Sequence, residues 1–344
     1  MAPKRRTKVE ADAPEAFTPQ RFEKELKDLA AKAKDESWSK EAIQQASTYA
    51  NSAILLVLMG AYSTVSQMAL SPVYGAIPTA IWHSKMVMAA CFVGWAGNLY
   101  LNRLLPVRPA KLIPLIAVYI PTIQFFLFKL SATLSGRWGP LVTEALTVFP
   151  LMVLSVAQVA SNLEHMNLSS LPKFIGDSVP GMASFGLFKF VESYSGKFLM
   201  RHAGKTFFQT RMGLEMVLAA SYVLLSPSKL LLFTLPAVLH TTFFNYHVFT
   251  PMAITSLQNS LQADQWLLID RKESLTGYIS VIESLEQGFR VLRCDHSLLG
   301  GEWVKFKEAP VAEPIYGVFV MLEAVRLVEV AKPIKDRDAS ALVM

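Results

Sequence analysis

The residues best suited to chemistry lie close together near the C-terminus, in residues 290–303 (RVLRCDHSLLGGEW). Cys294, Asp295 and His296 follow the apolar pair Val291-Leu292, which favours a short strand. A cysteine and a histidine two residues apart in a strand share a face, but nucleophilic catalysis also needs a third group to orient the histidine. We therefore interpret Cys294 as a small core residue, and the residues after it as a hydrogen-bonded turn.

A partner strand precedes this stretch. Residues 275–282 (LTGYISVI) are rich in β-branched and aromatic side chains, and Glu286-Gln287-Gly288 separates them from the second strand. This order predicts a β-hairpin.

These residues carry a resemblance to a known family. Residues 274–281 and 289–303 resemble the entry to the spermine/spermidine synthase-like domain, most closely in fungal members that carry it behind a multi-spanning membrane region. The resemblance implies a small β-domain before a Rossmann-like fold that binds decarboxylated S-adenosylmethionine and transfers an aminopropyl group. Asp295 matches the aspartate of the family's Leu-Asp-Gly turn, with His296 in place of the glycine, and Tyr316 matches the tyrosine of its Tyr-His-Glu helix start. It thus marks Asp295, His296 and Tyr316 as substrate-proximal.

In that family a glycine-rich turn follows the strand that residues 336–344 resemble, and here the sequence given ends at Met344. We therefore expect a partial spermidine synthase-like domain over residues 265–344, with an apolar helix at 314–328. We expect no catalytic residue and no cofactor in this chain, since decarboxylated S-adenosylmethionine or S-adenosylmethionine would need a complete domain. On this reading enzyme activity by the chain alone is not expected.

Composition indicates an integral membrane protein. The 344 residues are 52% hydrophobic and 17% charged, below the quarter that soluble domains usually carry, and the deficit falls in residues 52–260. The fold class predicted is mainly α, a polytopic bundle of about six spans followed by a small cytosolic hairpin and helix. The spans lie near 52–71, 82–101, 112–130, 141–161, 212–226 and 229–249. Residues 172–205 are read as an interfacial or re-entrant segment, because charges interrupt them.

Basic residues collect before the first run, between the second and third, and over 173–211. By the positive-inside rule both termini are cytosolic, on an endomembrane. Residues 1–51 form a separate N-terminal segment with an amphipathic helix. The partners expected are the lipid bilayer and a second copy, or another chain that completes the C-terminal domain. Nucleic acid is not expected, because the basic residues lie in loops between apolar runs and form no basic cluster on one face or helix.

Ionisable residues inside apolar runs are functional candidates, since a bare charge there is costly. They are Glu144, Glu215, His240 and His247, the last two seven residues apart and so on one helix face. They indicate a transporter or channel, or else hydrogen-bonded and snorkelling side chains in a scaffold protein. No HExxH-like spacing is present, so no metal is predicted.

Overall fold

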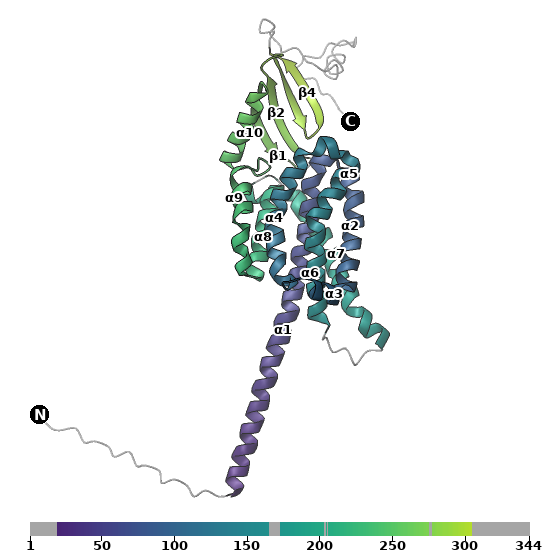
Figure 1. The fold of residues 1–344 in the computed structure, drawn as a ribbon, viewed down its shortest axis with the longest axis vertical. Helices are drawn as coiled ribbons and strands as arrows, with labels where there is room; N and C mark the ends of the chain where they lie inside the picture. Colours follow the sequence, from purple (N-terminus) through teal and green to yellow (C-terminus); the bar gives the residue numbers. More distant parts are fainter. Residues whose placement is uncertain (1–18, 165–172, 203, 205, 275–276, 305–344) are drawn as a thin grey trace, which may run out of the picture. The chain divides into compact units, whose positions relative to one another are not determined.

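The computed structural model describes residues 19–164, 173–202, 204, 206–274 and 277–304. They fall into two units, one ending at Asn51 and the other beginning at Ser52. The second unit holds a helical bundle and a sheet (Figure 1). The elements are α1 (Pro19–Tyr74), α2 (Ala76–Ala96), α3 (Asn98–Leu104), α4 (Pro109–Lys129), α5 (Ser131–Leu146), α6 (Val148–Leu163), α7 (Lys173–His202), η1 (Phe207–Gln209), α8 (Arg211–Leu225), η2 (Lys229–Thr234), α9 (Leu235–Phe243), α10 (Pro251–Ala263), β1 (Trp266–Glu273), β2 (Tyr278–Ser284), β3 (Phe289–Cys294) and β4 (Ser297–Trp303).

The bundle core is built from apolar residues at helical spacing. In α1, Leu55, Met59 and Tyr62 recur three or four residues apart and are buried. Helix α2 packs on α5 and α6, and α4 packs on α6 and α8. Every residue of α6 from Leu151 to Ala157 is buried, which places α6 at the centre.

Proline inside α4 is tolerated because side chains from neighbouring elements form hydrogen bonds with backbone carbonyls around it. Pro121 has no N–H, so the carbonyl of Ala117, four residues earlier, has no partner within the helix. The hydroxyl of Tyr62 donates a hydrogen bond to that carbonyl at 3.0 Å. The carbonyl of Pro121 in turn accepts from the side chain of Asn245 at 3.1 Å. These two bonds connect α4 to α1 and to the loop after α9.

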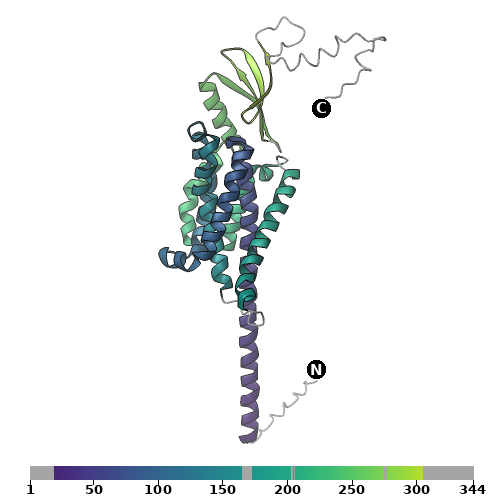
Figure 2. The ribbon, with the colours of Figure 1, turned by 90° about the vertical axis from the view of Figure 1, so that its right-hand side faces the viewer.

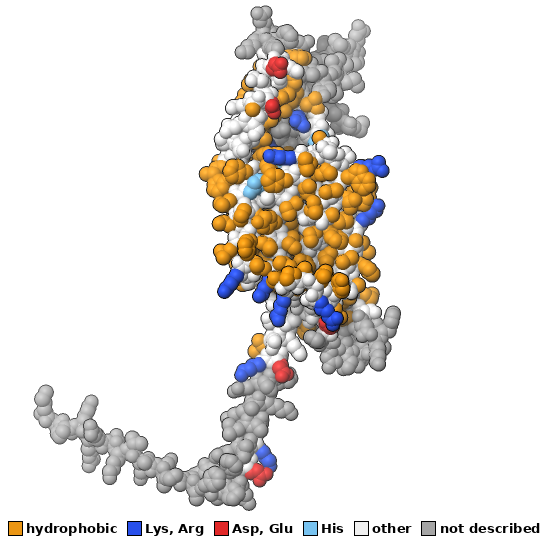
Figure 3. Space-filling view, in the orientation of Figure 1, with side chains coloured by type: hydrophobic (Ala, Val, Ile, Leu, Met, Phe, Trp, Pro, Cys, Tyr) orange, Lys and Arg blue, Asp and Glu red, His pale blue; other side chains and the backbone are white. Residues whose placement is uncertain are grey.

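The outer face of the bundle is apolar. Figure 3 shows hydrophobic side chains spread over it, with lysine and arginine side chains at its two ends. Ile77, Phe92 and Leu224 are among the large side chains most exposed to the surroundings. Four helical stretches in the described residues are long and apolar enough to cross a membrane, residues 40–74, 76–96, 109–129 and 131–163. The prediction of about six spans is therefore wrong, because the apolar runs near 212–226 and 229–249 form shorter helices.

Helix α7 bears on a second prediction. Residues 172–205 were expected to be interfacial or re-entrant. Lys173–His202 form one continuous helix that packs in the bundle, and its place relative to a membrane stays a prediction. Phe188 is fully buried, and Gly60 of α1 lies against its carbonyl, so close that an added methyl group would be 3.1 Å from that oxygen. Among the charges that interrupt the apolar pattern, Glu192 contacts Ser63 of α1 and lies near His83 of α2, as described below.

The strands form one antiparallel sheet in the order β1-β2-β3-β4 (Figure 2). The predicted hairpin is present as β2 and β3, where Ile282 pairs with Val291 and the turn contains Gly288 at φ 70°. The prediction was too small, because β1 and β4 extend the sheet on both sides. Strand β1 was not predicted, because its last four residues, Asp270 to Glu273, are all charged and such a run is typical of a loop.

The predicted fold class is corrected accordingly. The described chain is mostly helical with a four-stranded antiparallel sheet, and its apolar helices are identified by length and composition alone. The predicted helix at 314–328, the terminal strand at 336–344 and Tyr316 lie outside the described residues. The predicted boundary near residue 260 stays a prediction.

Candidate functional site

The sheet is joined to the bundle by a buried ion pair. Arg211 is the first residue of α8, and Glu273 is the last residue of β1. The Glu273 carboxylate accepts from the guanidinium at 3.0 Å and from the backbone N–H of Arg211 at 2.8 Å. A carboxylate at a helix N-terminus is also favoured by the helix dipole. Burial raises the pKa of Glu273, and the charge and N–H donors of Arg211 oppose that rise.

Arg271, two residues earlier on the same strand, makes a second connection. Its guanidinium donates to the carbonyl of Tyr246 at 2.6 Å and lies over the rings of Phe249 and Tyr278, at 5.1 and 4.8 Å from their centroids. Burial lowers the pKa of Arg271 from its usual value. An arginine nonetheless stays charged, so a fixed positive charge lies between the loop after α9 and the sheet.

The two-residue turn between β3 and β4 makes the third connection. Asp295 has φ 51°, a left-handed conformation that aspartate adopts more readily than most residues. Its carboxylate accepts from the backbone N–H of Tyr278 at 2.6 Å. The next residue, His296, places its ring Nε2 2.7 Å from the carbonyl of Val73 in α1.

A cavity of about 240 Å³ lies among these connections, and we call it the junction pocket. It is lined by Pro72, Val73, Phe128, Ser131, Tyr246, His247, Arg271, Tyr278, Ser280, Arg293, Asp295 and His296. Its wall therefore combines aromatic rings with two arginines and one carboxylate. Burial raises the pKa of Asp295, while the N–H of Tyr278 and the charge of Arg211 oppose the rise.

The structure brings three of the predicted site residues to this pocket, namely Asp295, His296 and His247. His240 does not join them. Its ring stacks on Phe126 with centroids 5.0 Å apart, near the end of α9. The two histidines were expected to share a helix face, but α9 ends at Phe243 and His247 follows in a turn. The Asn245 side chain stabilises that turn by accepting from the His247 N–H at 3.0 Å.

Glu144 is buried, and it lies in a different network inside the bundle. Its carboxylate is 2.6 Å from Nδ1 of His83, and Nε2 of the same ring is 2.9 Å from the hydroxyl of Ser63. Ser63 donates to Glu192 at 2.8 Å, and Glu192 also pairs with Lys189. The network joins α1, α2, α5 and α7. Sequence reasoning missed His83, although it is an ionisable residue in an apolar run, the feature that selected Glu144.

Glu215 is the remaining predicted residue. Its side chain in α8 is fully buried, and neither carboxylate oxygen has a hydrogen-bond partner. It does not line the junction pocket. Among the described residues, no group of three or more histidine, cysteine, aspartate or glutamate side chains is arranged to hold a metal ion.

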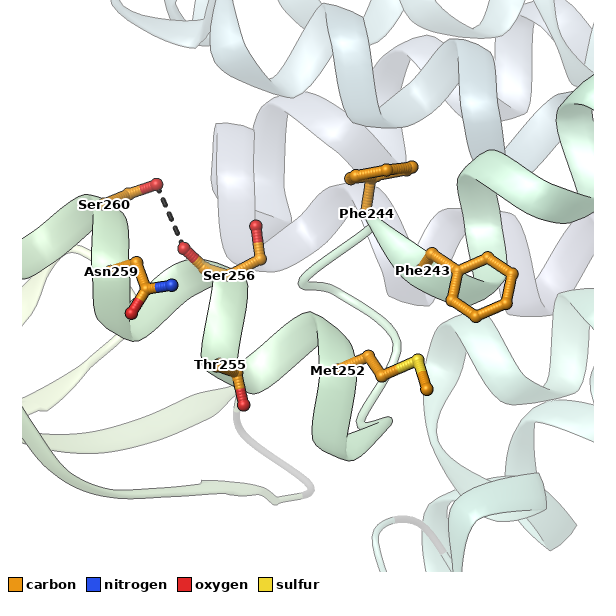
Figure 4. A pocket seen from close by; sticks show the side chains of 7 residues that line it. All are labelled: Phe243, Phe244, Met252, Thr255, Ser256, Asn259 and Ser260. Carbon is orange, nitrogen blue, oxygen red and sulfur yellow. Dashed lines mark hydrogen bonds between the residues drawn. The ribbon is translucent and has the colours of Figure 1, made fainter.

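Two further hollows differ in chemistry. One of about 630 Å³ lies between the end of α9 and α10, and Figure 4 shows its lining of Phe243, Phe244, Met252, Thr255, Ser256, Asn259 and Ser260. None of these side chains carries a charge. The other, about 510 Å³, is an apolar groove among α1, α2, α6 and α7, with Met59, Cys91 and Phe188 in its wall. The junction pocket alone of these three hollows offers charged groups.

Comparison with known proteins gives one relative of established activity. No family model matches the chain, and no solved structure does. The chain is 39% identical over 294 residues to an N-terminal histidine N-methyltransferase of Emericella nidulans. The chain resembles a methyltransferase. The match takes in 84% of this chain and 53% of the relative, so the chain spans about half of the relative's length.

This relative corrects the family and function predictions. It carries the name of an N-methyltransferase, so the assignment to an aminopropyltransferase family acting on polyamines is overturned. The alternatives of a transporter, channel or scaffold receive no support from it. The expectation of no cofactor in this chain is overturned as well, because the relative is named as a methyltransferase and such an enzyme requires a methyl donor.

Proposed function

We propose that this chain serves in the N-methylation of a histidine residue at the N-terminus of a polypeptide, with S-adenosylmethionine as the methyl donor. The observation that carries the proposal is the 39% identity to the Emericella nidulans enzyme over 84% of the chain. A match of this length includes both the helical bundle and the sheet, so it is more than a shared membrane-like composition.

The described residues do not fit the nucleoside of such a donor. Nucleoside sites of this kind use a glycine-rich turn between a parallel strand and a helix N-terminus. The sheet in the described residues is antiparallel throughout, and each of its turns leads into another strand. No step of the methyl transfer is therefore assigned to them, and their part in the proposed function is to receive and position the polypeptide.

The test is methyl transfer by the intact protein. Membranes from cells that express the chain are incubated with S-adenosylmethionine and a peptide that begins with histidine, and the peptide mass is measured. We expect the gain of a methyl group on the first residue, and no gain on a matched peptide that begins with alanine. Methylation no greater than in membranes from cells lacking the protein would refute the proposal.

We also propose that the chain is an integral protein of an internal membrane with both termini cytosolic, and that the bilayer is its main partner. The four long apolar helical stretches and the exposed apolar face support this. Resistance to extraction by alkaline carbonate and protease access to tags at both termini in sealed microsomes are expected. Release by carbonate, or protection of either tag, would contradict it. A second copy or another chain beside the C-terminal segment remains part of this proposal, to be tested by cross-linking.

A further inference from the structure

The junction pocket contains polar groups that are buried without a partner. Tyr278 and His247 are each 8% exposed, and the Tyr278 hydroxyl and His247 Nδ1 have no hydrogen bond. Both residues line the pocket. A buried polar atom left without a partner costs about 1–3 kcal/mol, and most such atoms in folded proteins are paired. Two of them on one small cavity indicate that a polar ligand completes the site.

The charges around the pocket limit what that ligand is. The guanidinium groups of Arg271 and Arg293 provide hydrogen-bond donors and carry positive charges. A simple cation would be repelled by those charges. Asp295 provides a carboxylate, so a simple anion would be opposed by it. A ligand that places a positively charged donor and neutral acceptors within a few ångströms of one another satisfies both sides.

The walls add a further requirement. Phe128 and His247 lie edge to face with ring centroids 5.2 Å apart, and the ring of His247 is 5.8 Å from that of Tyr278. Tyr246 lies 4.9 Å from His247 by the same measure. Rings arranged in this way favour a planar aromatic group, which can stack or meet them edge to face.

We propose that the junction pocket binds the first residue of the polypeptide substrate. The α-ammonium group pairs with the Asp295 carboxylate, and the adjacent backbone carbonyls accept from Arg271 and Arg293. The imidazole lies among the aromatic rings, where its nitrogens meet the Tyr278 hydroxyl and His247 Nδ1. This inference rests on the proposed function for the identity of the substrate. The position at which the substrate binds is inferred from the junction pocket.

The test is peptide binding to the purified full chain in detergent, measured by titration calorimetry. The probe is a short peptide that begins with histidine, compared with the same peptide acetylated at its N-terminus. We expect the free peptide to bind at least about tenfold more tightly, since a hydrogen bond to a charged group contributes about 1.5–3 kcal/mol and 1.4 kcal/mol is tenfold. Equal affinity for the two peptides would overturn the inference.

Variants separate this pocket from others. Asp295→Asn keeps the oxygen that accepts from Tyr278 and suits the left-handed backbone. It should abolish the preference for the free peptide. Tyr278→Phe keeps the ring and should weaken binding severalfold. Asn259→Ala, in the uncharged hollow of Figure 4, is the matched control and should change neither. Unchanged binding by Asp295→Asn would count decisively against the inference.

Methyl transfer to the same peptide distinguishes failure of the inference from failure of the proposed function. If the wild type methylates the peptide and Asp295→Asn raises KM with kcat unchanged, the pocket holds the substrate. If methylation proceeds with the same KM in that variant, the function stands and the inference fails. If the wild type binds the free peptide selectively but methylates nothing, the pocket assignment stands and the proposed function fails.

Discussion

Ionisation of Asp295 has opposite effects on the stability of the protein and on the binding of an ammonium ligand. Its carboxylate stabilises the turn by accepting from Tyr278, yet burial raises its pKa above the ordinary 3.8. A raised pKa means that the folded state holds the proton more tightly than the unfolded state, so ionisation at higher pH lowers stability. Ionisation is also what an ammonium ligand requires. Ionisation of Asp295 is therefore expected to lower the stability of the folded protein and to strengthen binding of the ligand.

The first prediction follows from these opposite effects. As pH rises from 3.8 through the raised pKa of Asp295, wild-type protein should lose stability relative to Asp295→Asn, while its affinity for the free peptide increases. Thermal unfolding of both proteins in detergent across this range measures the first effect, and titration measures the second. A stability difference that does not vary with pH would show that the carboxyl group does not titrate as expected.

Gly277 allows the Asp295 turn to approach β2. Its φ is 153°, and an added methyl group would lie 1.9 Å from the Asp295 carboxylate. Gly277→Ala should therefore displace that side chain, destabilise the protein and weaken binding of the free peptide. Gly186→Ala in α7 is the matched control, because no atom lies within 4 Å of the added methyl group and alanine favours helices. Peptide titration and unfolding are the measurements, and equal behaviour of the two variants would contradict the prediction.

Sequence reasoning selected Asp295, His296 and His247 but not the arginines that accompany them. Asp295 and His296 were selected because the family resemblance marks them as substrate-proximal, and His247 because it is an ionisable residue in an apolar run. Arg271 and Arg211 look like ordinary surface residues in the sequence, and only the packing of β1 against α8 buries Arg211 and encloses Arg271. Pairing over sixty residues of sequence leaves no local signal.

At the scale of elements, the connection between α8 and β1 decides whether the sheet stays on the bundle. The Arg211–Glu273 pair is almost completely buried, with 4% and 1% of the side chains exposed. Removing one partner of such a pair leaves a buried charge and costs about 3–5 kcal/mol, whereas replacing both with apolar residues is often neutral.

Arg211→Met should therefore destabilise the protein by about 3–5 kcal/mol, and the double variant with Glu273→Met should recover much of the loss. Arg290→Met is the control, since that arginine is 40% exposed and its pairs with Glu283 and Glu302 contribute about 0–1 kcal/mol. Urea unfolding followed by tryptophan fluorescence measures all three. If the loss of unfolding free energy in the double variant equals the sum of the losses in the two single variants, the two residues are not a coupled pair.

Element prediction succeeded where the pattern was local and failed where it was not. The hairpin of β2 and β3 was predicted from β-branched residues and a glycine turn. Helix α7 was not predicted as part of the bundle, because Lys189 and Glu192 were read as charges that interrupt an apolar run. Glu192 pairs with Lys189 of its own helix and also accepts a hydrogen bond from Ser63 of α1, and a contact with another helix cannot be read from one segment.

At the scale of the whole molecule, the imidazole of His83 is the centre of a hydrogen-bond network that connects four helices. His83 of α2 contacts Glu144 of α5 and Ser63 of α1, and Ser63 in turn donates to Glu192 of α7. Composition predicted an apolar bundle but gave no sign of this network. It also predicted more spans than the described residues have long apolar helices.

His83→Leu should lower the melting temperature of the whole bundle, because Glu144, 1% exposed, would lose its 2.6 Å partner. The expected cost is about 3–5 kcal/mol. Lys189→Met, at a side chain 49% exposed, should have a much smaller effect. Melting in detergent is followed by circular dichroism at a helix wavelength. A loss confined to α2, seen by hydrogen exchange, would contradict the four-helix role.

The same network has a consequence for how the protein is made. A ribosome delivers residues 63, 83 and 144 well before residue 192, so the growing chain holds three members of the network while the fourth is still inside the ribosome. Until α7 emerges, Ser63 lacks the Glu192 carboxylate that accepts from it in the folded protein. We therefore expect the bundle to reach its final packing only after α7 has been synthesised.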